Sequence, residues 1–173
     1  LMLTTGLALL FLIALLWGLW EVNPARADPT TRYVALTGVD SGNDCSVSGS
    51  PCRTIQHAVD EADSGDVILV AAGVYTDVET RPVPDNYHGP TSLDVDQIVL
   101  ITKTITIQGG HTTAFSGSAH PKANPTTLDA ESRGRGILIN GPITAAISGL
   151  RIAGGDATGL YGAGMQDAGG GVY

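Results

Sequence analysis

The chain has 173 residues with 17 acidic and 9 basic side chains, which give a net charge of −8. This balance excludes a typical nucleic-acid binder, which needs a basic face, and an electrostatic binder of membrane surfaces. The hydrophobic content of 43% is too high for a disordered chain, and the length suits one domain.

The N-terminal segment, residues 1–27, has the features of a signal peptide. Residues 6–20 are all apolar or glycine, a run that is short for a membrane span. A small-x-small cleavage pattern at residues 25–27 makes Asp28 the expected first mature residue. An uncleaved N-terminal anchor is the alternative. Both interpretations place residues 28–173 outside the cytoplasm.

Both ends of the chain look internal to a longer sequence. The first residue is Leu1, and residues 169–173 are typical of the start of a strand. We therefore expect an N-terminal piece of a longer protein, truncated at its C-terminus.

The chain contains two cysteines, Cys45 and Cys52, seven residues apart. An exported protein meets oxidising conditions, so the sequence predicts a disulfide between them. A metal-binding pair is the alternative, but no second cysteine pair completes a zinc site and His57 alone does not supply one.

An amphipathic helix is predicted after the second cysteine. Ser50 is a suitable N-cap and Pro51 a suitable first helical residue. The apolar side chains recur at helical spacing, at Ile55, Ala58, Val59 and Ala62. The solvent side is expected to carry Gln56, Asp60 and Glu61.

Short strands are predicted along the rest of the chain. The clearest are residues 33–36, 67–70, 98–101 and 104–107, with weaker apolar segments at 127–128, 136–139, 146–147 and 150–152. Residues 76–97 are expected to include a polar loop with three prolines. The dipeptide Asn140–Gly141 is compatible with a hairpin or with a corner between two strands.

An internal sequence repeat, called the internal echo below, favours a solenoid over a two-sheet sandwich. Residues 105–110 match residues 150–155, at an offset of 45 residues. That offset equals two coils of about 22 residues each, or one coil with a long insertion. A solenoid needs a cover over its first coil, and the predicted helix would provide it.

Several segments resemble the N-terminal region of exported bacterial right-handed parallel β-helix proteins of the pectin lyase-like superfamily. The resemblance covers about residues 33–173 and is most specific at residues 44–52, 54–59 and 65–75, which are similar to a capping helix and first rung. Residues 104–110, 126–130 and 147–155 resemble following rungs, and residues 169–173 resemble glycine-rich repeats. The resemblance implies the fold and export. It does not imply an activity, because members include polysaccharide lyases, hydrolases and adhesins.

Charged residues provide two sets of candidates for chemistry. Asp94 and Asp96 share one face of a strand-like segment, and Asp129, Arg133 and Arg135 form a cluster of mixed charge. Polysaccharide hydrolysis uses two carboxylates. We interpret these residues instead as solvated loop residues, and we predict no catalytic, cofactor-binding or metal-binding residue.

Metal binding has little support in the sequence. Residues 40–44 carry oxygen ligands at close spacing, but an EF-hand beginning at Asp40 would need glycine and glutamate where Cys45 and Pro51 stand. Bound calcium is therefore a minor alternative to turn stabilisation. The four histidines show no metal spacing: His57, His88, His111 and His120.

These observations predict an all-β fold, a right-handed parallel β-helix with an N-terminal amphipathic capping helix. The expected function is that of a secreted or cell-surface scaffold of the adhesion type, without catalytic activity in this segment and without a cofactor. Its expected ligand is a carbohydrate or another cell-surface ligand. We expect no nucleic-acid partner and no membrane span in the mature part, and we predict no oligomeric state. The alternative is the N-terminal part of a polysaccharide lyase or glycoside hydrolase whose active site lies downstream.

Overall fold

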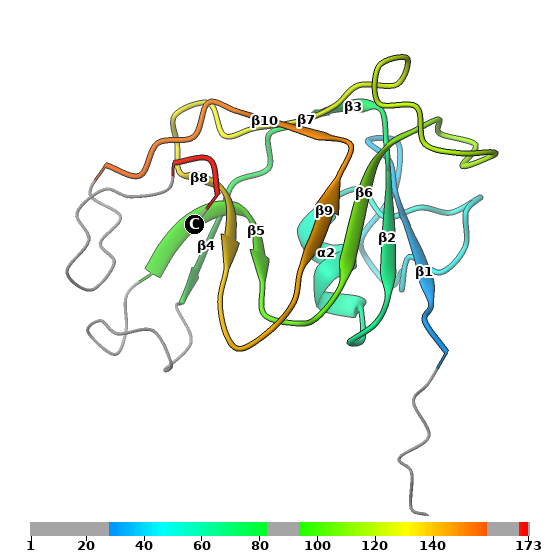
Figure 1. Ribbon diagram of the computed structural model, residues 1–173, viewed down its shortest axis with the longest axis horizontal. Coiled ribbons are helices and arrows are strands. Elements are labelled where there is room, and N and C mark those ends of the chain that lie inside the picture. The colour runs from blue at the N-terminus through cyan, green and yellow to red at the C-terminus, as the bar shows by residue number, and fades with distance from the viewer. Residues whose placement is uncertain (1–27, 83–93, 159–169, 173) are drawn as a thin grey trace, which may run out of the picture.

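The computed structural model describes residues 28–82, 94–158 and 170–172, which form three small β-sheets and one short helix (Figure 1). The predicted signal peptide, residues 1–27, lies outside the described residues. Within the described part of the chain, no helix has the length and apolarity needed to cross a bilayer.

The first sheet contains four parallel strands in the order β1–β2–β6–β9, seen side by side in Figure 1. Their bounds are Thr31–Val34 (β1), Val67–Ala71 (β2), Thr106–His111 (β6) and Ala146–Ser148 (β9). Ile68, Ile107 and Ile147 share one register position across the last three strands. Ile68 and Ile107 are fully buried, and Ile147 packs against the same core.

The second sheet contains three parallel strands in the order β10–β7–β3. Their bounds are Gly73–Tyr75 (β3), Thr126–Asp129 (β7) and Leu150–Ala153 (β10). Tyr75, Leu128 and Ile152 occupy equivalent positions and add to the core. The Tyr75 hydroxyl donates a hydrogen bond to the Ala71 carbonyl at 3.0 Å, and burial raises its pKa.

The third sheet is mixed. It contains β4 (Glu79–Pro82), β5 (Asp94–Ile101) and β8 (Arg135–Ile139) in that order. Strands β5 and β8 are parallel, but β4 runs antiparallel to β5. Strand β4 falls within the segment that the sequence predicted to include a polar loop. Arg81 of β4 pairs with Asp60 of the helix at 2.7 Å, which ties this strand to the helix.

The predicted fold class, a right-handed parallel β-helix, is therefore wrong. The described residues form separate small sheets, and the antiparallel β4–β5 pair prevents one all-parallel arrangement. The internal echo was misleading, since residue Ile107 pairs with Ile147 in the first sheet whereas Ile152 pairs with Leu128 in the second. The Asn140–Gly141 dipeptide forms a corner between two sheets, not a hairpin.

The helix α2 (Ile55–Glu61) lies behind the first sheet in Figure 1. Its predicted apolar stripe is confirmed, because Ile55, Ala58, Val59 and Ala62 are all buried. The predicted N-cap is wrong. Thr54 caps the helix, and its hydroxyl accepts a hydrogen bond from the His57 N–H at 3.2 Å.

Gln56 was expected on the solvent side of the helix but is only 2% exposed. Its amide oxygen accepts from the Leu100 N–H at 2.6 Å, and its amide nitrogen donates to the Leu100 carbonyl at 3.3 Å. This two-point contact joins the helix to β5. It explains how a polar side chain is buried without leaving its hydrogen-bonding groups unsatisfied.

Three charged side chains stabilise the helix end and the strands beside it. The Lys103 ammonium donates to the carbonyl oxygens of Val59, Asp60 and Ala62 at the end of the helix. Arg32 of β1 and Asp66, just before β2, form a buried ion pair at 2.9 Å. A seven-residue helix has little stability in isolation, so contacts of this kind keep it in place.

Candidate functional site

The predicted disulfide is present between Cys45 and Cys52, whose Cα atoms are 5.1 Å apart. Both cysteines are fully buried. The loop between them is bound to β1, because the Tyr33 N–H donates to the Cys45 carbonyl and the Ala35 N–H donates to the Cys52 carbonyl. The disulfide therefore fixes the chain that covers the outer edge of the first sheet.

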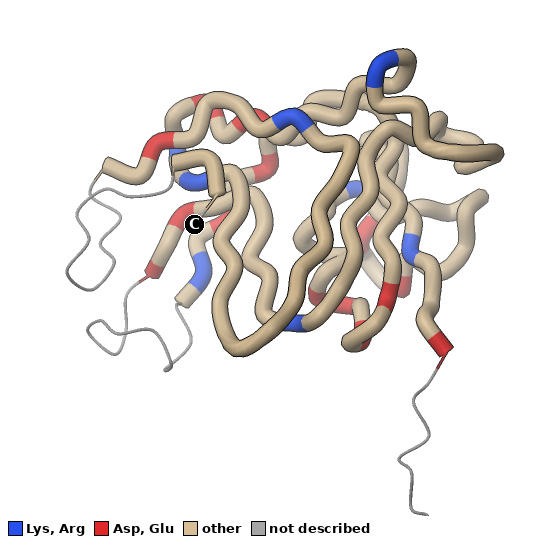
Figure 2. The backbone as a smooth tube through the Cα atoms, viewed as in Figure 1, with Lys and Arg blue, Asp and Glu red and all other residues tan. Residues whose placement is uncertain are grey.

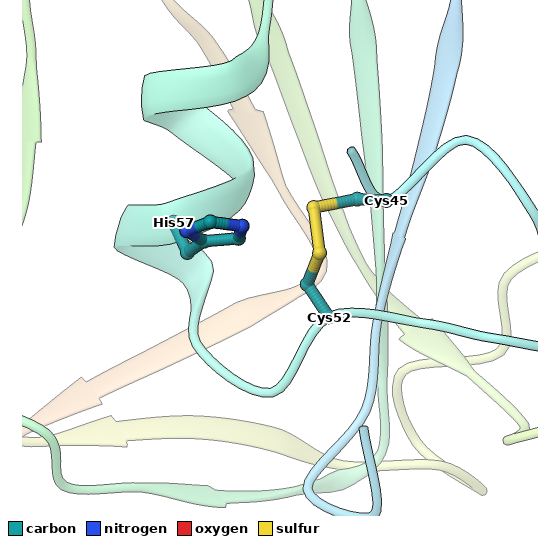
Figure 3. Close-up of side chains that lie close together, drawn as sticks. All are labelled: Cys45, Cys52 and His57. Carbon is teal, nitrogen blue, oxygen red and sulfur yellow. A yellow bond between two sulfur atoms is a disulfide. The ribbon is translucent and has the colours of Figure 1, made fainter. Parts of the chain in front are cut away.

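His57 lies beside this disulfide, and its ring points from the helix toward the sulfur atoms (Figure 3). The possible ligand atoms of Cys45, Cys52 and His57 lie within 4.8 Å of one another. A cysteine binds zinc only as a thiolate, however, and both sulfurs are in a covalent disulfide bond. The His57 Nε2 atom is 2.7 Å from the Asn43 carbonyl oxygen, which makes the ring a link between the helix and the loop.

The oxygen-rich segment at residues 40–44 stabilises a turn. One oxygen of Asp40 accepts from the N–H groups of Arg53 and Thr54, and the other accepts from the Thr54 hydroxyl. The Asn43 amide donates to three backbone carbonyls, at distances of 2.8–3.1 Å. These side chains are thus occupied by the protein's own hydrogen bonds, which favours turn stabilisation over calcium binding.

A shallow polar cavity lies at the start of β5 and beside the chain segments that flank β8 and follow β10. Its volume is about 120 Å³, and it is lined by Asp96, Ser132, Arg133, Gly134, Asp156 and Thr158. We call this the polar cavity. Side chains with carboxylate, hydroxyl and guanidinium groups thus converge on one opening in the described surface.

Gly134 brings the walls of the polar cavity together. A Cβ atom at this position would lie 2.5 Å from the Asp96 carbonyl oxygen, so only glycine allows this close approach. On its other side, the Gly134 carbonyl accepts a hydrogen bond from the Asp156 N–H at 2.8 Å. Asp96 and Asp156 are therefore brought to one cavity although 60 residues separate them in the sequence.

The hydrogen bonds in the polar cavity favour the ionised form of Asp156. The side-chain and backbone groups of Thr158 donate hydrogen bonds to Asp156 and hold its pKa below the usual value. The Thr158 N–H lies 2.8 Å from the Asp156 Oδ1 atom. Asp96 accepts a hydrogen bond from the Thr80 hydroxyl at 2.5 Å.

The structure separates the charged residues that the sequence grouped. Asp96 and Arg133 line the polar cavity, whereas Asp94 is an exposed residue at the start of β5. Asp129 accepts a hydrogen bond from the Glu131 N–H, as expected for a turn residue. Arg135 is buried, with 2% of its surface exposed, so the prediction of a solvated loop residue is wrong for it.

Ser132, Asp156 and Thr158 were not singled out from the sequence. They lie in segments around the turns that follow β7 and β10, and no local spacing connects them with Asp96. Only the lateral pairing of strands distant in sequence brings these segments together. The registers of both the β5–β8 and the β7–β10 pairs would have been needed to identify them.

The described histidines do not form a common site. His111 is 4% exposed, burial lowers its pKa, and its Nε2 atom lies 3.1 Å from the Gln108 amide oxygen. His120 is an exposed residue of the loop before β7. His88 lies outside the described residues.

Comparisons with models of protein families, with curated proteins and with solved structures find no match. The function therefore has to be argued from the chemistry of the cavities and from the sequence.

Proposed function

We propose that the chain is a secreted or cell-surface binding module that contacts carbohydrate through the polar cavity and has no catalytic activity in this segment. The observation that carries the proposal is the convergence of Asp96, Asp156, Ser132 and Thr158 on one open cavity. Carboxylates accept hydrogen bonds from sugar hydroxyls, and serine and threonine hydroxyls both donate and accept.

The hydrogen bonds to Asp156 make it unsuited to be the general acid of a glycoside hydrolase. A hydrolase needs one carboxylic acid with a raised pKa to protonate the leaving group. The hydrogen bonds from Thr158 shift the pKa of Asp156 in the opposite direction. At neutral pH this side chain is a hydrogen-bond acceptor and a poor proton donor.

Two features support export. The apolar segment at residues 6–20 has the composition of a signal peptide, and the Cys45–Cys52 disulfide is typical of an oxidising compartment. The short loop between the cysteines holds the N-terminal part of the domain in place, as suits a module that works outside the cell.

Affinity electrophoresis in gels that contain soluble polysaccharides tests the proposal. We expect at least one neutral polysaccharide to retard the protein, and Asp96→Asn and Asp156→Asn to reduce the retardation. Both variants keep the size of the side chain and remove one charge. Asp94→Asn is the matched control, because it removes the same charge from the same strand outside the cavity.

Incubation of the retarding polysaccharide with the protein should release no reducing ends. Equal retardation of wild type and both cavity variants, each measured against its own migration in a gel without polysaccharide, would overturn the proposal. Loss of binding in Asp94→Asn to the same extent would assign the effect to net charge and overturn it as well.

A further inference from the structure

A second cavity lies at the opposite end of the β7–β10 pair from the polar cavity. Its volume is about 240 Å³, and it is lined by Pro121, Pro125, Thr126, Gly149, Leu150 and Arg151. We call this the apolar cavity, because two proline rings and a leucine supply most of its wall. An apolar site of about 150 Å³ is large enough for one benzene ring, so this cavity has room for a group of ring size.

Gly149 shapes the wall of the apolar cavity at the corner between β9 and β10. Its φ of +67° lies in the left-handed region, and a Cβ atom there would collide with the Gly109 carbonyl oxygen. The same Cβ atom would lie 3.1 Å from the Pro121 ring. The glycine thus lets the corner approach the proline loop closely and defines one side of the cavity.

Two cations without an ion-pair partner among the described residues lie in the wall of the apolar cavity or next to it in sequence. Arg151 lines it and is exposed, and Lys122 follows the lining residue Pro121 and is exposed too. In the described part of the chain, no ion pair engages either side chain. Figure 2 shows these basic positions on β10 and on the loop between β6 and β7. In a protein with a net charge of −8, this part of the described surface thus has a basic residue in an apolar cavity wall and a second one adjacent in sequence.

We propose that the apolar cavity binds a small organic acid, a carboxylate attached to an apolar group of ring size. The Arg151 guanidinium would bind the carboxylate through paired hydrogen bonds, a geometry that suits its planar fork. The proline rings and Leu150 would cover the apolar group. An inorganic anion leaves this apolar wall unused, and a cationic ligand is repelled by both basic residues.

Two-dimensional amide NMR of the disulfide-bonded chain with 3-phenylpropionate as the probe tests this inference. We expect shifts at the amides of Thr126, Leu150 and Arg151, with an affinity in the millimolar range that is usual for a ligand of about a dozen atoms. The neutral analogue 3-phenylpropanamide and inorganic phosphate serve as comparison ligands. Each should bind about tenfold more weakly than the acid, because the amide lacks the carboxylate and phosphate lacks the apolar ring.

Arg151→Gln should weaken binding of the acid by about tenfold or more, since a hydrogen bond to a charged group is lost. Lys122→Gln should weaken it by only a few fold, as expected for an exposed charge near the site. Arg53→Gln is the matched control and should bind normally, because it removes an exposed cation that pairs with Asp77 far from the cavity in sequence. The amide spectrum of each variant reports directly whether the fold is retained.

Several outcomes would overturn the inference. Equal binding of the amide would show that the carboxylate is not recognised, and equal binding of phosphate would show simple ion attraction. An unchanged affinity in a folded Arg151→Gln variant would remove the proposed contact. Tighter binding of a peptide that ends in phenylalanine would show that the ligand is the C-terminus of a polypeptide and not a small organic acid.

Discussion

The buried ion pair between Arg32 and Asp66 gives the sharpest prediction about stability. Side-chain exposure is 9% for Arg32 and 4% for Asp66. One carboxylate oxygen of Asp66 accepts from the Thr30 N–H at 2.8 Å. The other accepts from the Arg32 Nε at 2.9 Å and from the Asp63 N–H at 3.0 Å. Asp66→Asn replaces one of these two acceptor oxygens by an NH₂ group, so at least one donor loses its acceptor, and it leaves Arg32 without its counter-ion.

Removing one partner of a buried pair costs about 3–5 kcal/mol, because the remaining charge is buried without compensation. Arg32 keeps one hydrogen bond, from Nη1 to the Asp44 carbonyl at 2.6 Å, so we expect the lower end, about 3 kcal/mol. For a domain of this size each kcal/mol lowers the Tm by roughly 2–4 °C, which gives a decrease of roughly 6–12 °C.

The contribution of Asp66 depends on pH in a defined direction. Burial alone raises its pKa, but the hydrogen bonds from Asp63, Thr30 and Arg32 outweigh burial and hold the pKa below the ordinary value of 3.8. The folded state therefore favours the ionised form. The resulting stability is present above the ordinary pKa and is lost as the pH falls through the lowered value.

Urea unfolding followed by circular dichroism at pH 7 and at pH 3 measures both effects. The difference in unfolding free energy between wild type and Asp66→Asn should be about 3 kcal/mol at pH 7 and smaller at pH 3. Asp63→Asn is the matched control, an exposed carboxylate three residues away, and should change stability by less than about 0.5 kcal/mol. A loss below about 1 kcal/mol for Asp66→Asn at pH 7, or a loss independent of pH, would refute the reasoning.

Three further changes test other parts of the fold. Lys103→Met keeps the aliphatic stem of the side chain but removes the donor to three helix carbonyls. The free energy of unfolding should fall by about 2 kcal/mol, and the Tm by several degrees. Lys103→Arg, which keeps a donor, should recover part of the lost stability. Reduction of the disulfide should lower the free energy of unfolding by about 2–3 kcal/mol, seen as a lower urea midpoint, and an unchanged midpoint would contradict a structural role. Gly149→Ala should be destabilising in thermal melts by at least about 2 kcal/mol, through backbone strain and a collision with Gly109. Gly42 has a similar φ, but a Cβ atom there would meet no other atom, so Gly42→Ala should lose only the stability that backbone strain removes. Equal losses of stability in Gly42→Ala and Gly149→Ala would argue against the collision.

The sequence predicted individual elements better than their partners. Apolar spacing located the buried side of the helix correctly at Ile55, Ala58, Val59 and Ala62. It misplaced Gln56, because burial of this amide depends on the backbone of Leu100, which lies 44 residues away in sequence. The N-cap was misplaced for a similar reason, since the Asp40 carboxylate binds the Arg53 and Thr54 N–H groups just before the helix begins.

The arrangement of the strands was less predictable. Apolar runs identified most of the strands, but β4 was hidden in a proline-containing polar segment, and its antiparallel pairing changes the fold class. The sequence echo compared two segments that lie in different sheets. A match between two sequence segments at a fixed offset therefore did not predict the register of strand pairing. That register depends on which strands are neighbours in each sheet.

For the candidate site too, the sequence identified residues on single elements but not the contacts between elements. Asp96 was noted as a carboxylate on a strand-like segment, and it does lie on β5, but it was interpreted as a solvated loop residue rather than as part of a site. Asp156 was not recognised, because its relation to Asp96 passes through Gly134 and the pairing of β8 with β5. A sequence pattern identifies residues on one element, whereas this cavity is built between elements.

The order of strands within the sheets has a consequence for how the domain forms during synthesis. Each sheet extends in chain order, from β1 to β9, from β3 to β10 and from β4 to β8. Among the described strands, none has to insert between two strands that come earlier in the chain. A polypeptide that emerges N-terminus first could therefore add each new strand to an edge that already exists, beginning from the loop closed by the disulfide.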